Sequence, residues 1–190
     1  LLYWTASLIA RLPWTWLRGM ADAFARAWIG RNDRTERVVR RNLELAYPEL
    51  LPAQRESLVG AVMRTTARQG VETLRFWTQP HAKNLALLRE THGVEWFDAA
   101  VASGHGVIVA APHYGSWELL NQWLASRTPL AILYAPPESE VAEAFLRRVR
   151  AAHGDAGRVT QVRAEGPAIR GLFKLLQGGG VAGILPDQQP

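Results

Sequence analysis

The chain has 190 residues, of which 48% are hydrophobic, and this is enough for one domain with a substantial core. It contains no cysteine, so disulfides, thiol nucleophiles and cysteine-based zinc sites are excluded. The net charge is +5, and the whole surplus lies in residues 1–75, which are rich in arginine, whereas residues 76–190 are neutral. Arginine forks suit phosphate recognition, and a coding bias towards arginine is the alternative explanation.

Residues 1–30 are crowded with tryptophan and aliphatic side chains. A membrane-spanning helix needs about 20 mostly apolar residues, and this segment fails that test from Arg11 onwards. We expect the end of a spanning helix followed by an interfacial helix, because tryptophan and arginine are typical of a membrane surface. An aromatic-rich core helix is the alternative. Because the sequence starts at Leu1 and stops just after a strand-like run, we expect a fragment that lacks both ends.

Residues 31–80 are predicted to form a helical subdomain. The first helix covers 33–47 and ends before Pro48, because the residue before a proline avoids the α region. It carries four arginines at helical spacing: Arg34, Arg37, Arg40 and Arg41. A second helix begins near Pro52, a favoured first-turn residue, and its modest apolar stripe includes Leu58 and Val62.

From residue 81 onwards the pattern alternates between strands and helices. The predicted strands are 107–110, 130–134, 159–162 and 181–185, and the predicted helices between them are 117–125, 140–152 and 167–177. Such alternation is typical of βαβ units. The sequence therefore predicts an α/β fold with a mostly parallel sheet flanked by helices. Its segments are a membrane-associated region at 1–30, a helical subdomain at 31–80 and an α/β core at 81–190.

The hexapeptide His113–Glu118 (HYGSWE) directly follows the first predicted strand and begins the next helix. Open α/β sheets bind their ligands at this end of the strands. A carboxylate near an imidazole can hold one ring nitrogen protonated and leave the other free to take a proton. We therefore predict a base at His113 with Glu118 as its partner. A surface histidine beside a helix-capping acid is the alternative.

Ser116 lies inside the same hexapeptide and is the alternative nucleophile. A nucleophile elbow needs small residues around the serine, whereas Trp117 and Glu118 follow it here. A helix N-cap role for Ser116 fits better. The five histidines show no recognised metal-ligand spacing, and the glycines at 178–180 lack the lysine and the serine or threonine of a P-loop.

Further polar residues occur on the last turn of a predicted helix or just after a strand. They are Arg147, Arg148, Arg150, Arg163 and Asp187. All of them can converge on the side of the sheet that holds His113. For each arginine, a solvated surface position is the alternative.

Four stretches agree with one known family in order and spacing. They are Arg41–Leu50 (RNLELAYPEL), His113–Glu118 (HYGSWE), Leu133–Pro136 (LYAP) and Gly183–Gln188 (GILPDQ). Together they resemble the bacterial lipid A late acyltransferases, the lauroyl and myristoyl transferases within the wider glycerolipid acyltransferase superfamily.

The resemblance implies an O-acyltransferase of lipopolysaccharide biosynthesis at the cytoplasmic face of the bacterial inner membrane. Such an enzyme moves a fatty acyl chain from acyl carrier protein to a hydroxyl of a lipid A precursor bearing Kdo sugars. It uses no cofactor or metal and binds no nucleic acid.

By the same resemblance, His113 would be the general base, and Glu118 would orient it and stabilise the imidazolium. Spacing places the family's functional arginine at Arg150, with the neighbouring Arg147 and Arg148 as alternatives, and its aspartate at Asp187, while Arg163 would contact phosphate or substrate. In one departure, Ala135 stands where members often carry a basic residue.

Three alternatives to the lipid A reaction stay open at this point. The first keeps the chemistry but makes a phospholipid or another glycolipid. The second is a serine hydrolase that uses Ser116. The third is a membrane-binding module without catalytic activity.

Overall fold

The structure, a computed structural model, describes residues 2–135, 137, 139–151 and 159–186. Its elements in chain order are α1 (Leu2–Ile9), α2 (Trp14–Trp28), α3 (Arg34–Ala46), α4 (Pro52–Thr78), α5 (His81–Leu85), α6 (Val94–Ala102), β1 (Val107–Ala110), α7 (Trp117–Arg127), β2 (Leu130–Tyr134), α8 (Glu140–Ala151), β3 (Val159–Arg163), α9 (Gly166–Gln177) and β4 (Val181–Ile184). They form two compact units, Tyr3–Arg75 and Phe76–Pro190. The division that the sequence suggests at residues 30 and 80 stays a prediction.

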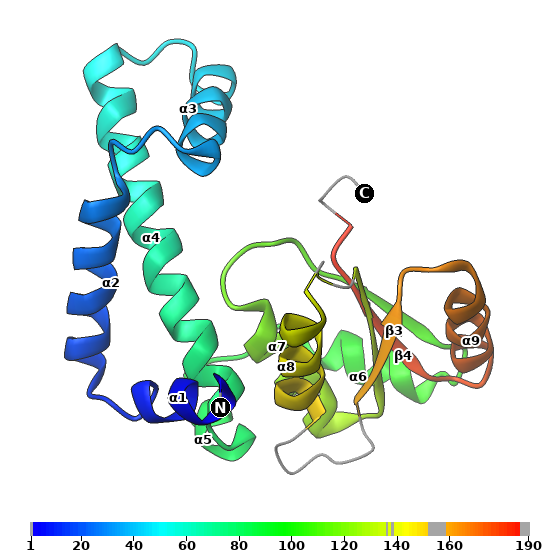
Figure 1. Ribbon diagram of the computed structural model, residues 1–190. Coiled ribbons are helices and arrows are strands. Elements are labelled where there is room, and N and C mark those ends of the chain that lie inside the picture. Colours follow the sequence, from blue (N-terminus) through cyan, green and yellow to red (C-terminus); the bar gives the residue numbers. More distant parts are fainter. Residues whose placement is uncertain (1, 136, 138, 152–158, 187–190) are drawn as a thin grey trace. The chain divides into compact units, whose positions relative to one another are not determined.

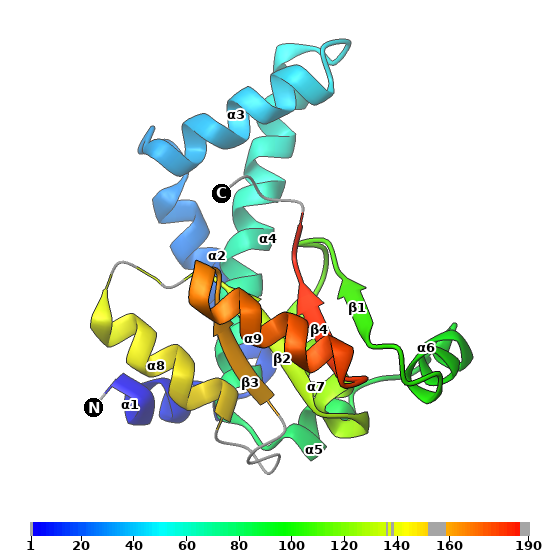
Figure 2. The same ribbon diagram turned by 90° about the vertical axis from the view of Figure 1, so that its right-hand side faces the viewer.

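The second unit is built on one sheet of four parallel strands in the order β1-β4-β2-β3. The connections from β1 to β2 through α7 and from β2 to β3 through α8 run in one direction across the sheet. The connection from β3 to β4 through α9 runs in the opposite direction. Because such crossovers are right-handed, α7 and α8 cover one face and α9 covers the opposite face. Figure 1 shows this sheet nearly edge-on between the two layers of helices, and Figure 2 gives the view turned by 90°. The predicted α/β class with a parallel sheet is confirmed.

Aliphatic side chains of the central strands form the core of the second unit. Leu130 and Ile132 of β2 and Val181 of β4 are buried against Leu124 of α7. Phe97 and Val101 of α6 and Val107 of β1 are partly buried and pack against this cluster. Burial of each such side chain contributes on the order of 1.5–3 kcal/mol, so the two middle strands hold the sheet together.

The turn into β1 requires glycine at position 106. Gly106 has φ +80°, and a Cβ there would lie 2.2 Å from the carbonyl oxygen of Leu176. No other residue fits both the left-handed backbone and this close approach. The contact brings the end of α9 against the start of β1, just before β4 pairs with that strand.

The predicted strands agree with the observed ones to within one residue. β-branched and aliphatic runs between turn residues are an unambiguous signal. The short helices α5 and α6 are not predicted, because 5 and 9 residues give little periodicity.

In the first unit, small residues let α2 and α4 approach closely. Ala21 and Ala25 of α2 pack against Ala67 and Val71 of α4. The side chain of Arg68 donates two hydrogen bonds to Asp22, Nε to Oδ1 at 2.6 Å and Nη2 to Oδ2 at 2.7 Å.

The stripe predicted for α4 is wrong in its register. Val59, Met63 and Ala67 are buried, whereas Val62 is exposed and Leu58 is only half-buried. The small side chain of Ala67 gives no hydrophobic signal by itself, yet it occupies the position where the two helices meet.

A buried carboxylate joins the loop after α2 to the start of α3. Glu36 accepts backbone hydrogen bonds from Gly30 at 3.0 Å and Asn32 at 2.9 Å, and it pairs with Arg40 at 2.7 Å. Asp33, the N-cap of α3, accepts from the backbone N–H of Glu36 in return. These bonds satisfy the free donors at the helix start. Hydrogen bonds from Arg40 and from the Asn32 backbone hold the pKa of Glu36 below its usual value.

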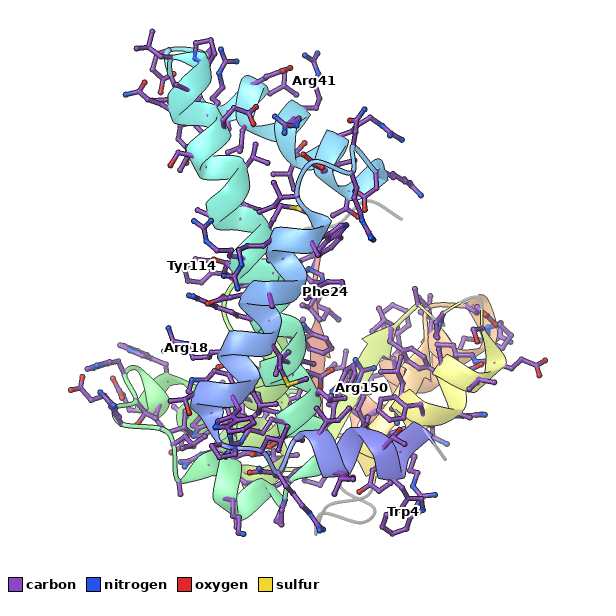
Figure 3. All side chains as sticks on the ribbon, turned by 60° about the vertical axis from the view of Figure 1, so that its left-hand side comes forward. Trp4, Arg18, Phe24, Arg41, Tyr114 and Arg150 are labelled. Carbon is purple, nitrogen blue, oxygen red and sulfur yellow. The ribbon has the colours of Figure 1, made fainter. Side chains whose placement is uncertain are left out.

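Aromatic and aliphatic side chains project from the two N-terminal helices. Trp4 on α1 is exposed, as are Trp16, Met20 and Phe24 at four-residue spacing on α2. Figure 3 shows Arg18 and Phe24 leaving α2 on different sides. Within the described residues, the length and apolar composition that a bilayer crossing requires are not found together in any helix. The membrane-associated segment expected at 1–30 stays a prediction.

The lowered pKa of Glu36 predicts a pH-dependent loss of stability in Glu36→Gln. A carboxylate whose pKa is lower in the folded state stabilises the fold above its unfolded value, and this contribution disappears as the pH falls through the folded value. Glu36→Gln should therefore lower the free energy of unfolding at pH 7, and the difference from wild type should shrink below about pH 4.5. Urea denaturation followed by circular dichroism measures this. Glu44→Gln, which removes only an exposed pair with Arg41, is the matched control, and an equal pH-independent loss in both variants contradicts the prediction.

Candidate functional site

A tight loop places His113 at the end of β1. The backbone N–H of Tyr114 donates to the carbonyl of Pro112 at 2.7 Å, so His113 is the central residue of a three-residue turn. Gly115 follows with φ +65°, a left-handed conformation that favours glycine. These two features reverse the chain between the strand and α7 and leave the His113 side chain exposed at the carboxyl edge of the sheet.

Ser116 occupies the N-cap position of α7, as predicted. Its side chain makes no capping hydrogen bond within the described part of the chain. Its backbone carbonyl accepts from Leu119 and Leu120 and so begins the helix. The position is confirmed, whereas the predicted side-chain cap is not present in this geometry.

Glu118 and Arg150 form a buried ion pair. Glu118 lies in the first turn of α7 and Arg150 in the last turn of α8. Nη2 and Nε of Arg150 donate to the same oxygen, Oε1, at 2.8 and 3.3 Å. The two side chains are only 4% and 8% exposed. Charges buried this deeply are stable only when they are paired and hydrogen-bonded, so the pair fixes α7 and α8 relative to each other.

Two aromatic rings enclose the guanidinium of Arg150. Its central carbon lies 5.0 Å from the ring centroid of Trp117 and 6.0 Å from that of Tyr134, both within the range of cation–π attraction. Trp117 in turn meets His113 edge-to-face, with ring centroids 6.4 Å apart. The aromatic ring of Trp117 therefore contacts both the exposed imidazole and the buried cation. Direct orientation of His113 by Glu118 stays a prediction.

A pocket of about 510 Å³ opens at the carboxyl edge of the sheet and contains both His113 and Arg150. Its walls come from Trp117 and from the ends of β2 and β4, with Ile132, Leu133, Tyr134, Ile184, Leu185 and Pro186 among the lining residues. The pocket has the position that α/β sheets give to their ligands, and its mostly apolar lining suits a hydrocarbon.

A second apolar pocket of about 470 Å³ lies between α6 and α7. Phe97, Leu119, Leu120 and Trp123 line it, and Ser116 stands at its border. Since Ser116 and Trp117 are consecutive, this pocket and the His113 pocket share the start of α7.

Arg163, predicted to contact phosphate or substrate, lies at the end of β3 and forms an ion pair with Glu143 of α8. The hydroxyl of Tyr134 donates to the same carboxylate at 3.2 Å. The hydrogen bond from Arg163 holds the pKa of Glu143 below its usual value. Arg163 remains 44% exposed, so it can contact a solute at the edge of the sheet.

The other predicted site residues are placed differently. Arg147 and Arg148 of α8 are exposed, so of the three neighbouring arginines it is Arg150 that reaches Glu118. Asp187 lies outside the described residues. Among the residues that the structure describes, no three histidine, aspartate or glutamate side chains gather as metal ligands would.

The sequence interpretation missed three buried amides, which lie on α5 and on the turn of α7 after Glu118. Gln122 of α7 and Asn84 of α5 both donate to the backbone carbonyl of Phe76, at 2.9 and 3.0 Å, and Asn84 also donates to Gln122 Oε1 at 2.8 Å. Asn121 is buried beside them. The sequence does contain a pattern that could have identified them. Glu118, Asn121 and Gln122 have the i, i+3, i+4 spacing of a core-facing helix stripe, but a search for apolar periodicity misses them because all three are polar.

The match to known families covers the whole chain. The family model described as bacterial lipid A biosynthesis acyltransferase matches residues 1–190. The chain therefore belongs to this family.

Curated relatives support the same assignment. The chain is 28% identical over 160 residues to the lipid A biosynthesis palmitoleoyltransferase of Escherichia coli, an alignment covering 82% of this chain and 48% of that protein. It is 31% identical over 120 residues to a phosphatidylinositol mannoside acyltransferase of Mycobacterium tuberculosis, covering 63% and 37%. Identity to the E. coli lipid A biosynthesis lauroyltransferase is 22% over 180 residues, covering 95% and 56%. The chain spans about half the length of the curated lipid A relatives it matches.

The buried pair predicts strong coupling between Glu118 and Arg150. Arg150→Met leaves a buried carboxylate without its partner and should cost about 3–5 kcal/mol of unfolding free energy. Glu118→Gln should also destabilise, and the double variant should lose clearly less than the sum of the two. Urea denaturation followed by tryptophan fluorescence measures the cycle.

The exposed pair of Arg127 with Asp98, at 2.6 Å, is the matched control in the same unit. Its coupling should be about 1 kcal/mol or less, because solvent screens both charges. Equal coupling energies in the two cycles contradict the assignment of Glu118–Arg150 as a buried, structure-determining pair.

Proposed function

We propose that this protein transfers a fatty acyl chain from the thioester of acyl carrier protein to a hydroxyl of a lipid A precursor. One observation carries the proposal: His113 lines a largely apolar pocket at the carboxyl edge of the sheet, and Arg150 of the buried Glu118–Arg150 pair lines the same pocket. Membership of the lipid A acyltransferase family supports the reaction class.

In the proposed reaction, His113 takes the proton from the acceptor hydroxyl as the oxygen attacks the thioester carbonyl carbon. The tetrahedral intermediate then collapses, the carbon–sulfur bond breaks, and the new ester bond remains. The imidazolium returns its proton to the departing thiolate, so the histidine ends as it began. No acyl-enzyme forms.

Glu118 stabilises the imidazolium in this proposal, as the acid of a catalytic triad does. Both hydrogen bonds from Arg150 end on Oε1, so the second carboxylate oxygen is assigned to the imidazole. Arg150 then acts as the positioning residue that prevents Glu118 from rotating away. Arg163 and Asp187 are assigned to the acceptor or its phosphate groups, on the family resemblance and, for Arg163, on its partial exposure.

The apolar surfaces of the site fit an acyl chain. The wall of the His113 pocket is mostly aliphatic and aromatic, and the pocket at Phe97 and Trp123 adds a second apolar volume beside α7. A hydrocarbon chain gains about 0.8 kcal/mol for each methylene it buries, so such surfaces supply binding energy that depends on chain length.

We also propose that the first unit associates with the cytoplasmic face of the bacterial inner membrane. The support is the exposed stripe of Trp16, Met20 and Phe24, together with the arginine surplus of residues 1–75. Tryptophan and arginine favour the interface of an anionic bilayer, and the same charge attracts an acidic carrier protein.

A different glycolipid acceptor is the second candidate. The observation that favours it is the 31% identity to a phosphatidylinositol mannoside acyltransferase. Both candidate acceptors carry phosphate and sugar hydroxyls at a membrane surface, so the same base and the same apolar pocket serve either reaction.

Acyl transfer assays with purified full-length protein distinguish the acceptors. Acyl carrier thioesters are supplied with a Kdo-bearing lipid A precursor, with a phosphatidylinositol mannoside or with a lysophospholipid. The proposal expects the lipid A precursor to be the preferred acceptor. Transfer to either of the other lipids but not to the lipid A precursor overturns it.

The base assignment predicts opposite results for His113 and Ser116. His113→Ala should lower the transfer rate by about 10²–10⁴-fold, the usual contribution of a general base. Ser116→Ala should retain most activity, because a serine at this position only begins α7. Loss of turnover in Ser116→Ala with activity retained in His113→Ala would indicate a serine hydrolase instead, and unchanged transfer in His113→Ala and Glu118→Ala would exclude the proposed site.

The membrane proposal predicts weaker vesicle binding when the stripe is made polar. Replacing both Trp16 and Phe24 by serine should lower the affinity for anionic vesicles at least about ten-fold, since each aromatic ring contributes on the order of 1.5–3 kcal/mol when buried. Sedimentation with phosphatidylglycerol-containing vesicles measures this. Trp96→Ser, which changes a still more exposed tryptophan of the second unit, should bind like wild type. Identical behaviour of both variants refutes the assignment.

A further inference from the structure

A small cavity lies against the inner side of the Glu118–Arg150 pair. It measures about 10 Å³, and its polar lining includes Glu118, Asn121 and Gln122 of α7 together with Arg150 of α8. Ile132 and Val149 form part of its apolar wall. A volume of this size corresponds to one water molecule.

Two hydrogen-bond donors that α7 and α8 contribute to this lining have no partner among the described residues. They are Nδ2 of Asn121 and Nη1 of Arg150, both completely shielded from solvent. The Asn121 residue is 8% exposed and the Arg150 side chain is 8% exposed. A buried donor without an acceptor costs about 1–3 kcal/mol, and folded proteins almost always satisfy such groups with protein or ordered water.

The chemistry of the lining restricts what the cavity can hold. Both unpartnered atoms are donors, so the occupant has to accept two hydrogen bonds. A cation is excluded by the guanidinium, and an anion is disfavoured by the carboxylate of Glu118, which lines the same space. A water molecule accepts twice and still has two protons for other acceptors.

We propose that one buried water accepts hydrogen bonds from Asn121 Nδ2 and Arg150 Nη1, and that Asn121 thereby acts as a positioning residue for the Glu118–Arg150 pair. Arg150 is then held through all three guanidinium nitrogens, Nε and Nη2 by Glu118 and Nη1 by the water. Asn121 lies three residues after Glu118 on the same side of α7. Helix α7 therefore supplies both side chains that hold Arg150, Glu118 directly and Asn121 through the water.

The catalytic consequence rests on the proposed function, whereas the water and the fixed guanidinium do not. A guanidinium that is held at three points cannot rotate, so the Glu118 carboxylate keeps the orientation that the proposed function requires. Misplacement by about 1 Å of a group that orients a catalytic base costs up to about 10²-fold in rate. Loss of the Asn121 contact should therefore appear in kcat rather than in KM.

Two direct measurements test the water and the Arg150 contact without an activity assay. A crystal structure at high resolution should show one water within hydrogen-bond distance of both donors. In ¹⁵N spectra, the Nε–Hε resonance of Arg150 should shift in Asn121→Leu, which fills the space but removes the donor. A dry cavity, or an Arg150 signal that is the same in Asn121→Leu and wild type, overturns the inference.

Kinetic measurements test the positioning role. In the full-length protein, Asn121→Leu should lower kcat about 10- to 100-fold with KM nearly unchanged, and Asn121→Ser, which restores a donor and leaves room for water, should recover most of the rate. Asn84→Leu is the matched control, because Asn84 is also a buried amide, at 0% exposure, and does not line the cavity. It should lower the melting temperature but leave kcat and the Arg150 resonance unchanged.

The outcomes separate this inference from the proposed function. Wild-type transfer to a lipid acceptor with no kcat effect in Asn121→Leu refutes the positioning role and leaves the acyltransferase proposal intact. An ordered water and a shifted Arg150 signal in a protein that transfers no acyl chain support the structural inference and refute the function.

Discussion

The buried ion pair between Glu118 and Arg150 is the interaction on which the rest of the site depends. It joins α7 to α8 on one face of the sheet, and its two charges are almost completely removed from water. Desolvation of two charges is costly, so the pair is stable only if its geometry and its surroundings compensate. Trp117 and Tyr134 provide part of that compensation through their ring faces. The same rings then form the wall of the pocket that contains His113.

The order of the strands explains why distant parts of the chain meet at this pocket. β4, the last strand, inserts between β1 and β2. Its carboxyl end therefore lies beside the loop that carries His113, and the backbone N–H of Ala111 donates to Ile184 at 2.9 Å. Because every strand is parallel, all four carboxyl ends face one edge. A parallel sheet with this order brings the HYGSWE and GILP stretches and residues 133–135 together without any long-range signal in the sequence.

The sequence predicts the scaffold well and the partners of the charged groups poorly. Strand positions follow from short aliphatic runs, and the start of α7 follows from Gly115 and Ser116. That Arg150, rather than Arg147 or Arg148, contacts Glu118 depends on the rotation of α8 against the sheet, which periodicity defines only to within about one residue. The register error on α4 has a similar cause, since Ala67 is buried by close helix approach and not by its own hydrophobicity.

Helix α7 buries polar side chains at positions where aliphatic side chains would stabilise the fold more simply. A helix that packs on a sheet normally buries aliphatic residues at i, i+3 and i+4, yet α7 buries Glu118, Asn121 and Gln122 there. Each of these groups has to find a partner or lose about 1–3 kcal/mol. Glu118 is paired by Arg150 of α8, and Gln122 by Asn84 of α5 and the carbonyl of Phe76 on α4, so three separate elements have to be in place before the helix can pack. Nδ2 of Asn121 has no such partner among the described residues. Leucines at these positions would give the same helix a simpler core, but they could not pair with Arg150, which lines the His113 pocket. The polar stripe therefore replaces an aliphatic helix face with a buried ion pair that joins α7 to α8.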